Sequence, residues 1–306
     1  MSISNELTRN GSVSERPRTA ERLVKSPGLP LGKATRLAAI YAACLLISAV
    51  TMIPVLWMLK TSFETTQFIH SQQIQFWPIQ FTWEHYLNVL NNPHALVFRS
   101  AFNSLSVATM ATLLNLMITA SAGYALSRFE FRGKALFGLY LLLYYMIPRT
   151  LLLIGMFVML ARLHLINQHL GLVITYAAAG IPLAVWWLKG YFDAIPVEIE
   201  EQAMIDGASR LGALRHIILP LALPGVAAVG VIQFVDAWNE FQLALTIIQT
   251  NELQLLPVRI VNFMSFQRTD WGPTMAFSVM VAIPAIILFA IVQRNMISGL
   301  MSGFGK

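Results

Sequence analysis

A polar segment separates two apolar runs in the second half of the chain, and it reads KGYFDAIPVEIEEQAMIDGASRLGALRHIILP (residues 189–220). Pro196 suits the first position of a helix, and the glutamates that follow it favour a helix N-terminus. Gly207 suits a break between two helices, and Pro220 suits the start of the next apolar helix. The segment therefore predicts two short helices that lie across one face of a membrane domain.

The composition of the chain indicates that lipid is its main solvent. Hydrophobic residues occupy 56% of the 306 positions and charged residues only 12%, and the mean hydropathy is +0.62. Soluble domains carry about 25% charged residues, so this chain has roughly half of that share. The single cysteine, Cys44, excludes an intrachain disulfide, and we expect it to be a buried structural thiol within an apolar run.

Six apolar runs are long enough to cross a bilayer, whose hydrocarbon core of about 30 Å needs about 20 helical residues. The third run is interrupted by Pro148 and Arg149, and the fifth carries Asp236 and Glu240. The predicted fold class is therefore all-α, an integral membrane protein with six transmembrane helices. We expect these helices at about residues 37–59, 101–126, 135–160, 170–188, 221–248 and 273–293.

The distribution of lysine and arginine predicts the orientation of these helices. Seven of these basic residues lie in a polar, proline-containing tail, residues 1–36, which we expect to be disordered; residues 37–306 form the membrane domain. With both termini inside, the cytoplasmic segments hold fifteen lysines and arginines and the outer segments hold five. The positive-inside rule therefore places both termini in the cytoplasm. Because the basic charge gathers beside an apolar run, we interpret it as a membrane flank and expect no nucleic-acid partner.

The 189–220 segment closely resembles the EAA loop of ABC-importer permeases, whose pattern is E-A-A, three residues, G, nine residues and then I-x-L-P. Gln202 replaces the first alanine of that pattern. The residues that match it at the required spacing are Glu201, Ala203, Gly207, Ile217, Leu219 and Pro220. The stretches F-E-F-R-G (129–133), W-N-E-F (238–241) and the C-terminal residues 299–306 also resemble the maltose-permease-like carbohydrate-uptake family. The resemblance covers about residues 37–306.

This resemblance implies a type I ABC importer permease fold with a core permease domain at about residues 98–294. In that family the EAA loop, here residues 189–220, forms a coupling helix that sits in a groove of a separate ATPase. The residues that it implicates in coupling are Glu201, Ala203, Asp206, Gly207, Ala208, Ile217, Leu219 and Pro220. The implied partners are a second homologous permease, an ATPase dimer that uses ATP and Mg, an extracytoplasmic solute-binding protein and the lipid of a bacterial cytoplasmic (inner) membrane. The C-terminal residues 299–306 could also reach the ATPase.

The implied substrate is a sugar, an oligosaccharide or a sugar-like polyol, with a glycerol phosphate as the alternative within the same class. The sequence contains no G-x-x-x-x-G-K-[ST] loop, no H-E-x-x-H pair and no G-x-S-x-G elbow. We therefore expect no catalytic residue, no metal and no bound cofactor in this chain. An ion-coupled secondary transporter that uses Asp236 and Glu240 is the competing function, but such folds often contain internal repeats and none is visible here.

Polar residues inside the apolar runs have more than one interpretation. Asp236, Trp238, Asn239 and Glu240 could line the transport pathway or contact the partner permease, and Glu240 could equally cap a helix end. Arg149, beside the helix-breaking Pro148, favours a structural role. The hydroxyl and amide residues of the 101–126 run favour helix packing over substrate binding.

Overall fold

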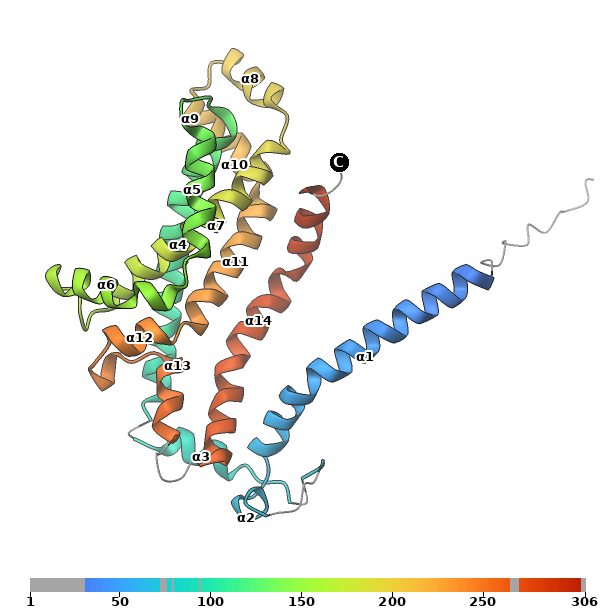
Figure 1. The fold of residues 1–306 in the computed structure, drawn as a ribbon, viewed down its shortest axis with the longest axis vertical. Coiled ribbons are helices and arrows are strands. Elements are labelled where there is room, and N and C mark those ends of the chain that lie inside the picture. Colours follow the sequence, from blue (N-terminus) through green and yellow to red (C-terminus); the bar gives the residue numbers. More distant parts are fainter. Residues whose placement is uncertain (1–30, 72–75, 79, 94, 265–269, 304–306) are drawn as a thin grey trace, which may run out of the picture. The chain divides into compact units, whose positions relative to one another are not determined.

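The computed structural model describes residues 31–71, 76–78, 80–93, 95–264 and 270–303, and the side chains at 31, 32, 34, 262, 263 and 292–303 are not described. Every regular element within these ranges is a helix (Figure 1). The expected disorder of residues 1–36 therefore lies almost wholly outside the described residues, although helix α1 already begins at Leu31. The end of the C-terminal segment 299–306 lies outside them as well.

Four helices are long and apolar enough to cross a membrane by themselves, and the number rises to six if each of two bent helix pairs is one span. The four are α1 (Leu31–Ser62), α4 (Val97–Arg128), α7 (His169–Asp193) and α14 (Trp271–Gly303). They contain the first, second, fourth and sixth expected runs. Cys44 is exposed on α1, which contradicts its expected burial.

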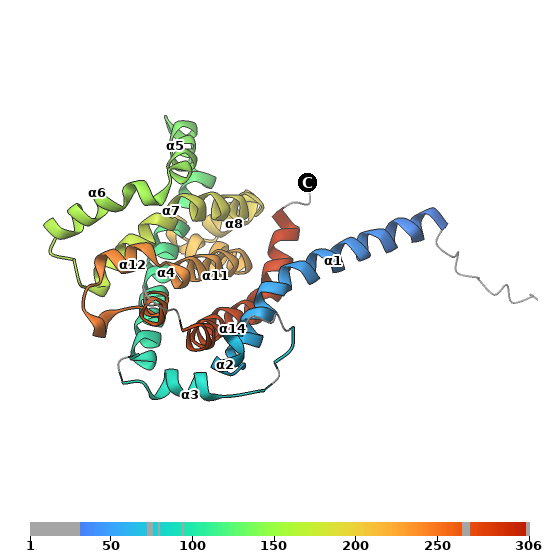
Figure 2. The ribbon, with the colours of Figure 1, turned by 60° about the horizontal axis from the view of Figure 1, so that its bottom comes forward.

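The third expected run, 135–160, is not one straight helix. It forms α5 (Lys134–Met146) and α6 (Arg149–Arg162), whose axes meet at 97°. Proline disfavours helical geometry in the residue before it, and Ile147 accordingly adopts an extended conformation ahead of Pro148. As a result α6 leaves the direction of α5 and projects to one side of the bundle of α4, α7 and α11 (Leu223–Asn239) (Figures 1 and 2).

The fifth expected run, 221–248, is also divided. Helix α11 (Leu223–Asn239) ends inside it, and the short helix α12 (Gln242–Ile247) follows. The division occurs at Glu240, whose carboxylate accepts hydrogen bonds from the backbone N–H groups of Leu243 and Ala244 and so begins a new helix. The preceding segment, Arg210–Leu221, meets α11 at an angle of 76°.

The remaining elements are short and lie at the two ends of the bundle. Helix α3 (Glu84–Asn91) lies at the opposite end of the bundle from α8 (Val197–Ile205) (Figure 1). The short α-helices are α2 (Thr66–Ile69), α3 (Glu84–Asn91), α8 (Val197–Ile205), α9 (Arg210–Ala213), α10 (Leu219–Leu221) and α13 (Leu256–Arg259). A π-helical turn covers Leu214–Ile218, and 3-10 turns cover Asn251–Leu253 and Ile260–Phe263.

Polar side chains on α4 connect it to its neighbours. Asn115 Nδ2 donates to the carbonyl oxygen of Ala177 on α7 at 2.8 Å, and Ser104 Oγ accepts from the backbone N–H of Leu256 at 2.8 Å. Asn103 Nδ2 donates to the carbonyl oxygen of Glu252 at 2.9 Å. These residues are buried, and the packing role that the sequence favoured for them is confirmed.

Gly180 allows α7, α4 and α11 to meet closely. A Cβ added to Gly180 would collide with the buried side chain of Gln233 on α11 and would lie 3.0 Å from Nδ2 of Asn115 on α4. Gly190, on the same helix, has no atom within 4 Å of the corresponding position. The tight junction at Gly180 therefore depends on the absence of a side chain.

We expect Gly180→Ala to lower the stability of the detergent-purified chain by about 1–3 kcal/mol, because the added methyl group overpacks the junction. Gly190→Ala is the matched control and should leave stability unchanged or raise it slightly, since alanine favours helix more than glycine does. Thermal unfolding of both variants measures the difference. Equal unfolding temperatures would contradict the tight packing at Gly180.

Candidate functional site

The segment between α7 and α11 folds into the two short helices that the sequence predicts. Helix α8 (Val197–Ile205) follows Pro196 and ends in a Schellman motif. Its Gly207 has φ +93° and donates its N–H to Met204 O at 3.1 Å, while Ala208 N donates to Ala203 O at 3.0 Å. Left-handed backbone at this position favours glycine, which explains why the break falls at Gly207.

Helix α9 begins at once after this turn. The Ser209 side chain accepts a hydrogen bond from Gly212 N at 3.1 Å, which is the standard cap of a helix N-terminus. With the Schellman motif on one side and the serine cap on the other, the turn between α8 and α9 has few degrees of freedom. The two helices therefore form one ordered unit.

Helix α8 has two different faces. Glu200 and Ala203 are buried against the bundle, whereas Glu201, Ile205 and Asp206 are exposed. Ile205 is 84% exposed, an unusual state for a large apolar side chain at the tip of a short helix. One face thus holds α8 on its own subunit, and the other is available for contact.

A buried ion pair attaches the inner face of α8 to the end of α4. Arg128 Nε lies 3.0 Å from Glu200 Oε2, and the two side chains are only 5% and 4% exposed. Tyr124 donates its hydroxyl to the other oxygen of Glu200, and the Arg128 guanidinium also donates to Ile195 O at 2.8 Å. Tyr124, Arg128 and Glu200 are called the α8 anchor below.

The α8 anchor was not predicted from the sequence. The glutamates after Pro196 favour a helix N-terminus, and this preference does not distinguish Glu200 from its neighbours. A helical period provides the available signal, because Glu200 and Ala203 are three residues apart and share a face. The partner on α4 has no signal in the sequence, since 72 residues separate it from Glu200.

The I-x-L-P part of the motif lies in the connection from α9 to α11. Ile218, the variable position of that pattern, is fully buried, while Ile217 and Leu219 are half-buried and Pro220 is exposed. Proline has no N–H to donate to the preceding turn, and the π-helical turn Leu214–Ile218 directly precedes it. This connection joins the α8 and α9 unit to the start of α11.

The four intramembrane residues Asp236, Trp238, Asn239 and Glu240 take different positions. Trp238 is 2% exposed, and its indole N–H donates to Val281 O on α14 at 3.1 Å. Glu240 accepts from the Tyr176 hydroxyl at 2.9 Å in addition to capping α12. Asp236 and Asn239 are exposed.

Arg149 does not stand alone beside Pro148. Its Nη1 lies 2.9 Å from Asp236 Oδ2, and the two side chains are 43% and 45% exposed. The pair therefore connects the start of α6 to α11. Of the four residues, Asp236 therefore pairs with Arg149. Trp238 packs against α14, and Glu240 caps α12.

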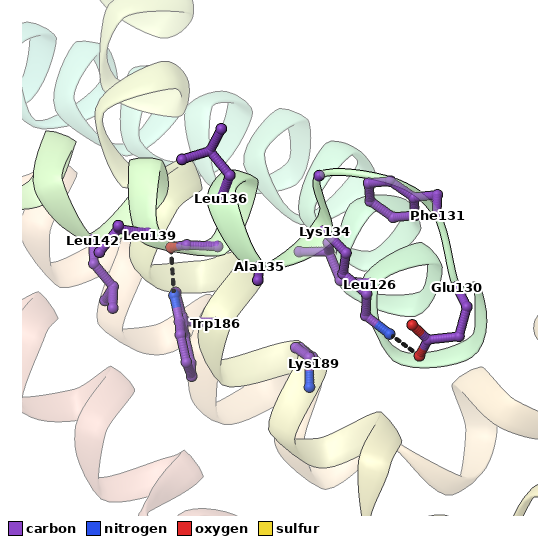
Figure 3. Close-up of a pocket in the computed structure, with 12 residues that line it drawn as sticks. Leu126, Glu130, Phe131, Lys134, Ala135, Leu136, Leu139, Leu142, Trp186 and Lys189 are labelled. Carbon is purple, nitrogen blue, oxygen red and sulfur yellow. Dashed lines mark hydrogen bonds and ion pairs between the residues drawn. The ribbon is translucent and has the colours of Figure 1, made fainter.

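A pocket of about 840 Å³ opens beside the turn that joins α4 to α5 (Figure 3). Its lining is mainly apolar, and its polar side chains already have partners in this chain: Lys134 Nζ contacts Glu130 at 2.7 Å, the Trp186 indole N–H donates to Gly138 O at 3.3 Å, and Lys189 pairs with Asp193. Specific ligand sites usually contain convergent polar groups that the protein leaves available. We therefore do not assign a ligand to this pocket.

The sequence matches a family model described as "Binding-protein-dependent transport system inner membrane component" over residues 115–300, more than half of the chain. It is 34% identical to the diacetylchitobiose uptake system permease protein DasC of Streptomyces coelicolor, covering 83% of this chain and 91% of that protein. It is also 34% identical to the trehalose/maltose transport system permease protein MalG of Thermococcus litoralis, covering 85% and 93%.

The fold is similar to that of a chain in the crystal structure of a bacterial ABC transporter involved in the import of the acidic polysaccharide alginate. The TM-score is 0.74 at 22% sequence identity, and the match covers 88% of this chain and 99% of that chain. At this identity the likeness concerns the fold alone.

We expect Arg128→Gln to destabilise the chain by about 3–5 kcal/mol, because it leaves the Glu200 carboxylate buried without its cation. The matched control is Lys134→Gln, which removes the cation of the Glu130 pair, where the acid is 88% exposed; such a pair contributes about 0–1 kcal/mol. Unfolding of the detergent-purified variants measures both. Similar losses for the two variants would show that the α8 anchor is not a special contact.

Proposed function

Because this chain belongs to the family of binding-protein-dependent transport system inner membrane components, we propose that it is the permease subunit of an ATP-driven importer of a sugar or an oligosaccharide. The names of two relatives support the substrate class, since one belongs to a diacetylchitobiose uptake system and the other to a trehalose/maltose transport system. The observation that carries the coupling role is the two-sided helix α8, with Glu200 buried and Glu201 exposed.

In this proposal the chain works with a second, homologous permease, two copies of an ATPase and an extracytoplasmic solute-binding protein. ATP and Mg are used by the ATPase, since this sequence has no loop that cradles phosphates. Large apolar side chains on α5 and α6 that are exposed in the single chain face lipid or the second permease in the assembly. Examples are Leu136, Tyr140, Leu151 and Ile154.

The assembly lies in the bacterial cytoplasmic membrane, with both termini and α8 in the cytoplasm. The excess of lysine and arginine in the segments on that side supports this orientation. It puts α8 where an ATPase has access to it and puts α3 at the outer side, where a solute-binding protein delivers its cargo.

The outer face of α8 docks into a groove of the ATPase. A short helix can insert into a groove of a partner through a few anchor residues. Here Ile205 supplies the apolar anchor, and Glu201 and Asp206 supply charges that match basic groups of the groove. The remaining residues of the motif set the shape of the unit: Gly207 and Ala208 form the turn, and Ile217, Leu219 and Pro220 connect it to α11.

Movement of the docked helix reaches the membrane domain by two routes. The α8 anchor transmits it to α4, and the segment Arg210–Leu221 transmits it to α11. Packed helices move as rigid bodies, so closure of the ATPase dimer around ATP shifts α4 and α11 together. This shift opens the pathway outward to receive substrate, and hydrolysis resets the inward-facing state.

The test is affinity purification of the tagged chain from native membranes in a mild detergent, with mass spectrometry of the proteins that accompany it. We expect an ATPase and a second permease. ATP hydrolysis by this complex is then measured with the solute-binding protein and each of diacetylchitobiose, trehalose, maltose and glycerol 3-phosphate. Recovery of the chain without an ATPase would overturn the proposal, and stimulation by glycerol phosphate alone would move the substrate class to phosphorylated polyols.

We expect Glu201→Lys to abolish co-purification of the ATPase and uptake of the sugar, while the second permease is retained, because the reversed charge faces a basic groove. Glu130→Lys is the matched control: it reverses an exposed acid in the turn between α4 and α5 and should leave the complex intact. Retention of the ATPase by Glu201→Lys at wild-type uptake would contradict the docking role of α8.

We expect Gly207→Pro to uncouple ATP hydrolysis from uptake, because proline cannot adopt φ +93° and lacks the N–H that bonds to Met204 O. Gly207→Asn is the control, since asparagine tolerates left-handed backbone better than other residues with a side chain. The ratio of sugar transported to ATP hydrolysed in proteoliposomes distinguishes them. Equal ratios for the two variants would show that the turn geometry has no part in coupling.

A further inference from the structure

Two breaks in the membrane helices meet at one place. The first is the bend between α5 and α6 at Pro148, and the second is the gap between α11 and α12 at Glu240. The ion pair of Arg149 with Asp236 joins the two, and Thr150 Oγ1 donates to Gln242 Oε1 at 3.3 Å beside it.

This meeting point lies at the depth of the hydrocarbon core. Helix α5 begins at Lys134, beside a basic turn, and Arg149 lies about 20 Å further along at the helical rise of each residue. Helix α11 begins at Leu223, and Asp236 also lies about 20 Å from that end. Since the core is about 30 Å thick, both estimates put the ion pair inside it.

The polar groups at this depth are not covered by the chain itself. Arg149 and Asp236 are each nearly half exposed, and Asn239 and Gln242 are exposed as well. Charged side chains and interrupted helices at membrane depth are tolerated where they line a water-filled cavity or are buried in protein. This patch of Arg149, Asp236, Asn239 and Gln242 therefore faces either water or the second permease, and not lipid.

Stability of this chain does not explain why the two charges are present. An exposed ion pair contributes little to stability, whereas charges within a span are costly to place. Glu240, only four residues from Asp236, has a structural role in this chain, because its carboxylate accepts hydrogen bonds from the Tyr176 hydroxyl and from two backbone N–H groups. In the exposed patch, Asn239 Nδ2 donates to Val235 O at 2.9 Å and Gln242 Oε1 accepts from Thr150, and each of these amides has a further donor or acceptor group that these contacts do not use.

We propose that Arg149, Asp236, Asn239 and Gln242 form a hydroxyl-binding site on this chain's side of the transport pathway, and that its ligand is a neutral polyhydroxylated molecule. The site rests on the proposed function and assigns part of its substrate recognition to this subunit. Vicinal hydroxyl groups accept from the Arg149 guanidinium and donate to the Asp236 carboxylate, while amides do both. The two charges cancel, so the site favours a neutral sugar over a phosphorylated polyol.

The first test measures water access and needs no transported substrate. In a Cys44→Ser background, which removes the single native cysteine, Asn239→Cys and Asp236→Cys are assembled with the partner subunits in lipid nanodiscs and treated with a cationic methanethiosulfonate reagent. We expect both to react, since a hydrophilic reagent reaches groups that line an aqueous pathway. Ile154→Cys, at a position on α6 that is 78% exposed in the single chain, is the control and should stay unreacted in lipid.

Failure of Asn239→Cys to react in an intact complex would overturn the site and would assign the patch to the contact with the second permease. That variant leaves the Arg149–Asp236 pair in place, so an unfolded chain cannot account for its result. Because the labelling requires only the assembled complex, a failure of the proposed function appears separately, as loss of the ATPase from the preparation.

The second test measures substrate recognition with the panel sugar that best stimulates ATP hydrolysis by the wild-type complex. We expect Asp236→Asn to raise the KM for uptake of that sugar about tenfold, because a charged acceptor of hydroxyl groups is lost. The matched control is Asp193→Asn, which neutralises an exposed acid at the C-terminal end of α7. An unchanged KM for Asp236→Asn, or a fall in the maximal rate alone, would contradict a contact with substrate.

Discussion

The hydrocarbon core of a membrane contains no water to satisfy backbone N–H and C=O groups, and most features of this chain follow from that constraint. It explains why every regular element in the described ranges is a helix, and why α4 connects to its neighbours through buried amide and hydroxyl groups such as Asn115 and Ser104. The same constraint applies where a helix stops within the membrane. At Glu240 the side chain accepts hydrogen bonds from the first free N–H groups of the next helix, and at Pro148 the break lies beside the charged residue Arg149.

Two ion pairs of similar length have different consequences because their burial differs. The Arg128–Glu200 pair is almost fully enclosed, so each charge depends on the other, and the pair fastens α8 to α4. The Arg149–Asp236 pair is nearly half exposed, so each charge retains access to whatever lies beside it. The first pair suits transmission of force within the subunit, and the second suits recognition. The distances within the two pairs do not distinguish these roles, whereas the burial of the pairs does.

The resemblance of residues 189–220 to the EAA loop is confirmed at the level of the family, whose model covers residues 115–300. The structure adds a physical account of the pattern. The glycine is required by a left-handed turn, the alanine at 203 lies against the bundle, and the proline at 220 follows a widened helical turn. Most of the motif thus determines the shape of the unit formed by α8 and α9 and connects this unit to the bundle. The exposed side chains of this unit include Glu201, Ile205 and Asp206.

The sequence by itself determined the helical membrane class, the positions of the long apolar helices and the two-helix form of the loop, because these depend on composition, on run length and on local preferences of proline and glycine. The sequence predicted one span at 135–160, interrupted at Pro148 and Arg149, and one at 221–248, but not the 97° bend of the first or the end of α11 at Asn239, because the length of an apolar run does not specify the direction of its helices. Only the tertiary structure decided which of the adjacent glutamates, Glu200 or Glu201, is buried, and that Arg149 meets Asp236. Those outcomes depend on contacts between residues 72 and 87 positions apart in the sequence, and such contacts form only when the helices pack together.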